Sequence, residues 1–295
     1  MADSVGVNYP EMRAAIKTEK ERRIREHQTY IATRSRMTTA MGAGAQGALN
    51  LICQGDSWFD YPLPVPVVNQ SDVVAHLKHL PSMSPEVLSL AHYGEAAEDM
   101  LGVTKLHEFL AQLEDPANGK FDAILFSGGG NDLAGNQFRL WLADAAASGM
   151  DPTKGLNPQR VTSILGVVAA GYQDLFIARD GIDKTIPIFA HSYDFAIPSG
   201  IGVCDLGPWL KPGLDDRGWT DLGMARSIVK QLLLEFDAML EAFATVAGNN
   251  FVHVKTQGTL ADAQWANELH PNPDGFAAIA GKFVDALRSS FPGRI

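Results

Sequence analysis

Residues 49–60 read Leu-Asn-Leu-Ile-Cys-Gln-Gly-Asp-Ser-Trp-Phe-Asp, an apolar run that ends in a Gly-Asp-Ser turn. Short apolar runs bounded by turn residues are typical of buried strands. Four similar runs follow, which gives five predicted strands at residues 49–53, 87–91, 122–126, 185–190 and 251–254.

Amphipathic segments separate these runs and close the chain. They predict helices at about residues 73–80, 96–113, 158–179, 221–247 and 273–289. Apolar strands that alternate with helices indicate an α/β fold, in which a five-stranded parallel sheet is covered by helices on both faces. In such a three-layer α/β/α sandwich, ligands bind beyond the carboxyl ends of the strands.

Composition narrows the classes of function. The net charge of −10 argues against nucleic acid as a partner. Cys53 and Cys204 are too few for a disulfide framework, and two free thiols in a reducing compartment are the simpler interpretation. No secretory signal or apolar run of about 20 residues is recognisable. We therefore expect a cytoplasmic protein without an integral membrane segment, although a dedicated export apparatus leaves no such mark.

Residues 1–48 differ from the rest of the chain. The segment from Glu11 to about Arg36 predicts a charged helix with few apolar positions, and the glycines between Gly42 and Gly47 predict a flexible link. We expect this helix to lie on the main domain, residues 49–295, or on a second subunit. The pattern permits a homo-oligomer without requiring one.

Three polar loops follow predicted strands. Ser57 follows the first strand, where Gly55 permits a tight turn and Asp56 can bond the loop backbone. Asn131 ends a glycine-rich turn after the third strand, and His270 lies in a proline-bounded loop before the last helix. Each loop alone is weak, because an N-cap serine or a phosphate-binding glycine loop has a similar composition. The glycine-rich turn nevertheless lacks both common nucleotide-binding patterns.

Together these loops resemble the conserved blocks of the SGNH hydrolase superfamily, also called GDSL esterases and lipases. The matching segments are Gly55-Asp56-Ser57, the glycine at Gly94 after the second strand, Gly129-Gly130-Asn131-Asp132 and His270-Pro271. Their order and spacing agree from about Leu49 to the end of the chain. The resemblance implies a flavodoxin-like SGNH hydrolase fold.

The resemblance also implies roles for these residues. Ser57 would be the nucleophile and His270 its base. The backbone N–H groups of Ser57 and Gly94, with the Asn131 side chain, would form the oxyanion hole. The scheme uses no metal and no cofactor.

One position departs from the family pattern, which has an Asp three residues before the histidine. This chain has Asn267 there. An amide oxygen can orient the imidazole but supplies no negative charge. Asn267 is our first candidate for the orienting residue and Glu268 the second, with Asp262 and Asp274 as further carboxylates near His270 in the sequence.

Other residues near the strand ends receive a structural interpretation. His191 and Asp194 follow the fourth strand and are expected to shape the pocket, since a metal site would lack a third obvious ligand. Residues 195–219 are expected to form a loop that covers the substrate. Trp58, Phe59 and Tyr61 either line a pocket or belong to the core.

Three functions follow from these residues. The first is hydrolysis of a carboxylic ester, acetyl or longer acyl, of a small molecule, a glycan or a lipid, through an acyl-enzyme on Ser57. The second is acyl transfer by the same site. The third, which Asn267 suggests, is a binding module that keeps the fold without catalysis. The intact set of Ser57, Gly94, Asn131 and His270 favours an enzyme.

Overall fold

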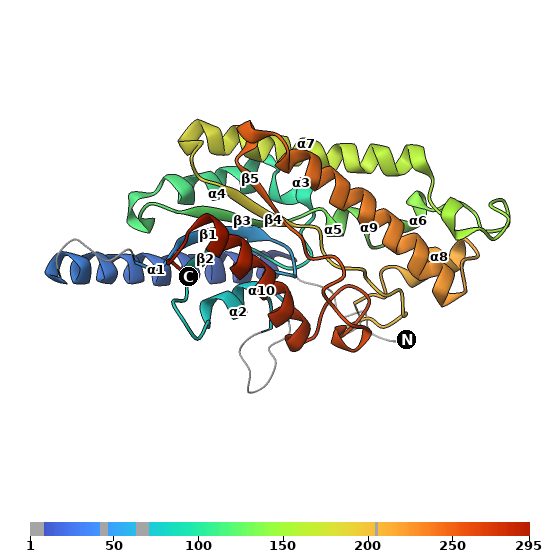
Figure 1. The fold of residues 1–295 in the computed structure, drawn as a ribbon, viewed down its shortest axis with the longest axis horizontal. Helices are drawn as coiled ribbons and strands as arrows, with labels where there is room; N and C mark the ends of the chain where they lie inside the picture. Colours follow the sequence, from blue (N-terminus) through green and yellow to red (C-terminus); the bar gives the residue numbers. More distant parts are fainter. Residues whose placement is uncertain (1–8, 42–46, 63–70, 204–205) are drawn as a thin grey trace.

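The computed structural model describes residues 9–41, 47–62, 71–203 and 206–295 (Figure 1). Its centre is a five-stranded sheet in the order β2-β1-β3-β4-β5, in which every neighbouring pair is parallel. The predicted α/β fold with five strands is therefore confirmed. The strands are β1 (Asn50–Gly55), β2 (Glu86–Ser89), β3 (Ala123–Ser127), β4 (Ile188–His191) and β5 (Phe251–Val254).

Helices cover both faces of the sheet. In Figure 1, α3, α4, α7 and α9 lie on one side, and α2 and α10 lie on the other, where they pack against each other. The helices are α1 (Tyr9–Met41), α2 (Val73–Lys78), α3 (Ala97–Met100), α4 (Val103–Glu114), α5 (Gly130–Leu133), α6 (Phe138–Trp141), α7 (Pro158–Asp183), α8 (Lys211–Asp216), α9 (Leu222–Ala244) and α10 (Pro273–Ser290). Short 3-10 turns are η1 (Pro116–Asn118), η2 (Pro152–Lys154), η3 (Ala247–Asn249) and η4 (Asp262–Gln264).

Polar caps determine where the longer helices begin. The side chains of Asn157, Asp221 and Asn272 accept backbone N–H groups in the first turns of α7, α9 and α10. Proline occupies the first helical position of α7 and of α10, where its missing N–H costs nothing. Each cap stabilises its helix by about 1 kcal/mol and sets the point at which the chain leaves the sheet edge.

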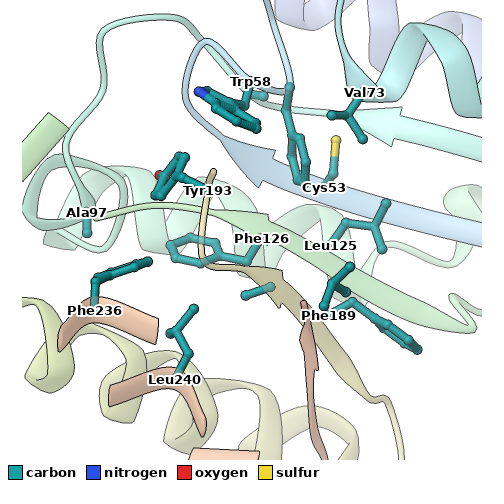
Figure 2. Packing of buried hydrophobic residues seen from close by; sticks show 14 of the residues in the cluster. Cys53, Trp58, Val73, Ala97, Leu125, Phe126, Phe189, Tyr193, Phe236 and Leu240 are labelled. Carbon is teal, nitrogen blue, oxygen red and sulfur yellow. The ribbon is translucent and has the colours of Figure 1, made fainter. Parts of the chain in front are cut away.

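The core lies between the sheet and the two helix layers. Figure 2 shows Phe126 of β3 on the side of the sheet that faces Phe236 and Leu240 of α9. Leu125 of β3 and Phe189 of β4 point away from these two residues, toward the other helix layer. These side chains are almost fully inaccessible to solvent. Burying an aromatic or branched apolar side chain stabilises a fold by about 1.5–3 kcal/mol, so this layer fixes α9 against the sheet.

Helix α1 packs along the edge strand β2 and against η1, and its carboxyl-terminal end projects past the sheet (Figure 1). The His27 ring is buried and stacks on Phe121 with a centroid separation of 5.6 Å. The Arg23 guanidinium donates to Asp60 at 2.7 Å and to the Ala91 carbonyl at 3.1 Å. In this structure the charged helix thus lies on the domain of its own chain.

Several details differ from the expectations. The predicted helix at 96–113 is two helices, because the chain turns at Gly102, which begins α4 as its N-cap. The loop expected at 195–219 contains α8. Within the described residues Cys53 is a buried free thiol, whereas Cys204 and residues 42–46 of the predicted link lie outside them.

Helix α7 is the single helix of the described segments that is long and apolar enough to cross a membrane, by length and composition alone. It packs against α3, α4, α5, α6 and α9. Its Arg179 is buried and donates to the carbonyls of Ile186 and Asn249 at 2.6 Å each, which fixes the helix to the sheet. Apolar composition is therefore weak support for membrane insertion of α7.

Candidate active site

The reversal in strand order places the site. The chain runs outward from β1 to β2 on one side and from β3 to β5 on the other, so the crevice opens where β1 and β3 end. Open α/β sheets bind ligands at such switch points. Ser57 follows β1 directly and Asn131 follows β3, so both lie at this crevice.

The structure brings Ser57, His270 and Asn267 together. Ser57 Oγ lies 2.7 Å from His270 Nε2, and His270 Nδ1 lies 2.9 Å from Asn267 Oδ1. An amide oxygen can only accept, so Nδ1 carries the proton and Nε2 is free to accept the hydroxyl proton of Ser57. This is the arrangement of a nucleophile, a base and an orienting group.

The Asn267 amide cannot be turned around. Its Oδ1 also accepts the backbone N–H groups of Leu269 and His270, at 3.1 and 3.0 Å. Its Nδ2 donates to the Tyr61 hydroxyl at 3.3 Å, and the Tyr61 ring lies 5.0 Å from that of His270. Reversal of the amide would set an NH2 group against two N–H donors. The network therefore fixes the imidazole tautomer without a carboxylate.

Burial governs the protonation of His270. The side chain is almost inaccessible to solvent, and burial lowers its pKa to about 4. Among its hydrogen-bonding partners in the described residues there is no carboxylate to offset this effect. His270 is consequently neutral, and able to accept a proton, well below neutral pH.

Glu268 was the second candidate for the residue that orients His270, but its carboxylate has other partners. Its buried carboxylate accepts four backbone N–H groups, from Gly200 at 2.9 Å, Trp209 at 2.6 Å, Leu210 at 2.7 Å and Lys211 at 3.1 Å. It therefore holds the loop after β4 rather than the imidazole.

The two more distant carboxylates do not hydrogen-bond the imidazole either. Asp262 pairs with Arg226, and Asp274 lies in the first turn of α10. Of the four sequence candidates, only Asn267 contacts His270 Nδ1.

A buried network holds the nucleophile loop. Asp56 accepts from the Trp58 N–H at 3.0 Å, the Ser127 hydroxyl at 2.8 Å and the Tyr193 hydroxyl at 2.6 Å. Burial raises the pKa of Asp56 to about 6, and these donors favour its ionised form. The carboxylate beside the nucleophile is thus fully engaged with the loop and with β3.

His191 completes this network instead of binding a metal with Asp194. Burial lowers the pKa of His191 to about 3, so the ring is neutral. Its Nδ1 accepts the Tyr193 N–H at 3.2 Å, which leaves Nε2–H to donate to Ser127 Oγ at 2.8 Å. Asp194 accepts the N–H groups of Phe195, Gly258 and Leu260. Each side chain already has its own partners.

The loops that carry Gly94 and Asn131 are tied to each other. Asn131 Nδ2 donates to the Glu95 carbonyl at 2.9 Å, which leaves its second N–H for another acceptor. Asp132 accepts the Ala97 N–H at 2.7 Å. Gly94 has a φ of +78°, a conformation that favours glycine. The role of Ser57, Gly94 and Asn131 as an oxyanion hole remains a prediction that this arrangement permits.

The aromatic residues beside Ser57 divide between core and site. Trp58 and Phe59 are buried, and Trp58 also lines the pocket next to Ser57. Tyr61 lies against His270. The sequence reasoning missed the contacts of Ser127 and Tyr193 with Asp56. The available signal was their position: Ser127 is the last residue of β3 and Tyr193 lies two residues after β4, and strand ends meet at one edge of the sheet.

Comparison with models of protein families finds no match, and comparison with curated protein sequences finds none. Among solved structures, the fold is similar to the lipase Lip_vut3 from a goat rumen metagenome, with 14% identity, 81% of this chain and 97% of that chain covered, and a TM-score of 0.52. A member of the lipolytic G-D-S-L family from Veillonella parvula has 17% identity, 81% and 97% coverage and a TM-score of 0.43. An extracellular lipase from Streptomyces rimosus has 15% identity, 82% and 99% coverage and a TM-score of 0.45.

These likenesses bear on the fold. The resemblance to SGNH hydrolases noted in the sequence is confirmed at that level. The expected cytoplasmic location stays a prediction.

Proposed function

We propose that this chain is a serine hydrolase that cleaves carboxylic esters through an acyl-enzyme on Ser57. The observation that carries the proposal is the 2.7 Å contact of Ser57 Oγ with His270 Nε2, in a ring whose tautomer Asn267 fixes. A hydroxyl bonded to the free nitrogen of a neutral, oriented imidazole is the ground state of nucleophilic catalysis.

The reaction follows from these atoms. Ser57 Oγ attacks the ester carbonyl carbon while His270 Nε2 takes the hydroxyl proton. The carbonyl oxygen becomes an oxyanion that the Ser57 and Gly94 N–H groups and the free N–H of Asn131 would stabilise, each donor contributing about 3–4 kcal/mol. His270 then returns the proton to the leaving alcohol. A water activated by the same ring releases the carboxylic acid and regenerates Ser57.

An amide at position 267 is compatible with this scheme. Asn in place of the triad Asp lowers kcat about 10⁴-fold in a chymotrypsin-type protease, because there the amide selects the wrong tautomer. Here the backbone N–H groups of Leu269 and His270 require the oxygen of Asn267 to face the ring. What is lost is the electrostatic stabilisation of the imidazolium. This supports a working but slower base over an inactive fold.

A fluorophosphonate probe and a series of p-nitrophenyl esters test the proposal. We expect covalent labelling and ester turnover by the native chain, and loss of both in Ser57→Ala. Ser290→Ala, an exposed serine at the end of α10, is the matched control and keeps both. Absence of labelling and of turnover in the native chain, or unchanged turnover in Ser57→Ala, contradicts the proposal. Product analysis with added alcohols separates hydrolysis from acyl transfer.

A further inference from the structure

A pocket opens beside Ser57 and extends away from it under α9. At its catalytic end it is lined by Ser57, Asn131 and His270. Beyond them its walls come from α5 and α6, from the loop after β4, from α9 and from the histidine loop. The apolar side chains that define these walls are Leu133, Phe138, Leu210, Val229, Leu232 and Leu269.

Three polar side chains in the walls already have hydrogen-bonding partners. Asp56 accepts three hydrogen bonds, and Asp194 accepts backbone N–H groups. The Tyr193 hydroxyl donates to Asp56 and accepts the Gly130 N–H at 3.0 Å. Beyond the catalytic groups the walls consist mainly of apolar side chains, which give the hydroxyls of a sugar few partners. An apolar group is therefore the favourable occupant, since a buried hydroxyl without a partner is costly.

We infer that this pocket binds the acyl chain of the substrate, and that this chain is longer than acetyl. The inference rests on the proposed acyl-enzyme, because the group left on Ser57 must fit the space that continues from Ser57 Oγ. The pocket passes from Ser57, after β1, to Tyr193 and Asp194, after β4.

An acetyl group would leave most of the apolar wall without contact. The leaving alcohol instead has a more polar environment available beyond Tyr61, where Lys20 and Arg23 of α1 and His92 line a second hollow.

Chain length then sets the rate. Burial of one methylene is worth about a fourfold change in binding, so kcat/KM rises about fourfold for each carbon that enters the pocket. From acetate to hexanoate, which differ by four carbons, the expected gain is about 250-fold. The rise ends where the chain meets the α9 wall at Val229 and Leu232.

The test is a p-nitrophenyl ester series from acetate to dodecanoate on the full chain and three variants. Leu232→Ala lengthens the pocket and shifts the preferred chain to more carbons, whereas Ala196→Leu adds bulk to the wall and lowers the ratio of hexanoate to acetate. Leu234→Ala, on the outer face of α9 with 46% exposure, keeps the native profile. Thermal melting shows whether each variant is folded. If one of the two pocket variants does not fold, the other is enough to test the proposal.

The outcomes separate the two proposals. A native profile that favours hexanoate over acetate and moves to longer chains in Leu232→Ala supports the acyl pocket. Turnover that is best with acetate, or a profile that neither pocket variant changes, overturns it while leaving the esterase in place. No turnover of any ester together with no fluorophosphonate labelling overturns the esterase itself.

Discussion

Replacement of Asn267 by Asp changes the site by one charge at almost constant shape. Asn267 Oδ1 lies 2.9 Å from His270 Nδ1 and accepts two backbone N–H groups, which a carboxylate would accept equally well. The variant therefore keeps the tautomer and orientation of the imidazole. What it adds is a negative charge beside a ring that is buried and whose pKa burial lowers to about 4.

The size of the effect follows from Coulomb's law. An ion pair about 4 Å apart at an effective dielectric constant near 20 gains about 4 kcal/mol. Desolvation of the new carboxylate offsets roughly half, which leaves about 2 kcal/mol. That corresponds to about 1.5 pH units, and the direction is upward, because the new negative charge raises the pKa of His270 in the variant. The same 2 kcal/mol stabilises the imidazolium of the transition state and raises kcat/KM about 30-fold where the ring starts neutral.

The assay is kcat/KM for one p-nitrophenyl ester between pH 4 and pH 9. The base works when neutral, so activity falls as the pH drops through its pKa. We expect the native enzyme to keep its activity to about pH 5. Asn267→Asp should be faster at pH 8 and should lose activity about 1.5 units earlier on acidification.

Asn157→Asp provides the control for charge alone, because it adds the same charge at the N-cap of α7, where Asp caps as well as Asn. Its profile should match that of the native enzyme. Two results refute the reasoning that burial without a carboxylate sets the pKa of His270. One is a native kcat/KM that already falls near pH 6.5 on acidification. The other is an Asn267→Asp profile whose fall does not move to higher pH.

Three further substitutions test contacts of the site. Tyr193→Phe removes the 2.6 Å hydrogen bond to Asp56 and should lower the free energy of unfolding by about 1.5–3 kcal/mol, measured by urea denaturation, with Phe59→Leu as a packing control. Glu268→Gln replaces two acceptor oxygens by one and leaves buried N–H groups unpaired, so the melting temperature should fall by several degrees, read by calorimetry. Arg23→Ala removes the bonds of α1 to Asp60 and the Ala91 carbonyl and should speed proteolytic cleavage within α1.

The sequence predicted what depends on local pattern. The strand at 251–254 has the predicted bounds, and the other four strands differ from them by a few residues, because buried parallel strands are short apolar runs. The break of one predicted helix at Gly102 was missed, since helical periodicity continues across it. Spacing alone did not choose among the four candidates near His270, but the family pattern put Asn267 first, and the structure has this residue at His270 Nδ1.

Contacts between segments that are far apart in the chain could not be predicted from the sequence. Tyr193 and Asp56 are 137 positions apart, and their hydrogen bond exists because β1 and β4 end at the same edge of the sheet. Glu268 was a reasonable partner for His270 by spacing, yet its carboxylate is directed to the loop after β4. One sequence predicts neither the direction in which a loop side chain points nor the N–H groups that it will bond.

The position of negative charge distinguishes this site from a serine triad that has an Asp. The buried carboxylate next to the nucleophile is that of Asp56, and Trp58, Ser127 and Tyr193 use its lone pairs to hold the Gly-Asp-Ser turn. The base has only the amide of Asn267. The charge therefore stabilises the geometry of the nucleophile, while the imidazole is kept neutral by burial. Such a site gives up part of the stabilisation of its transition state and gains a base that stays unprotonated in acid, where a carboxylate-paired histidine would already be charged.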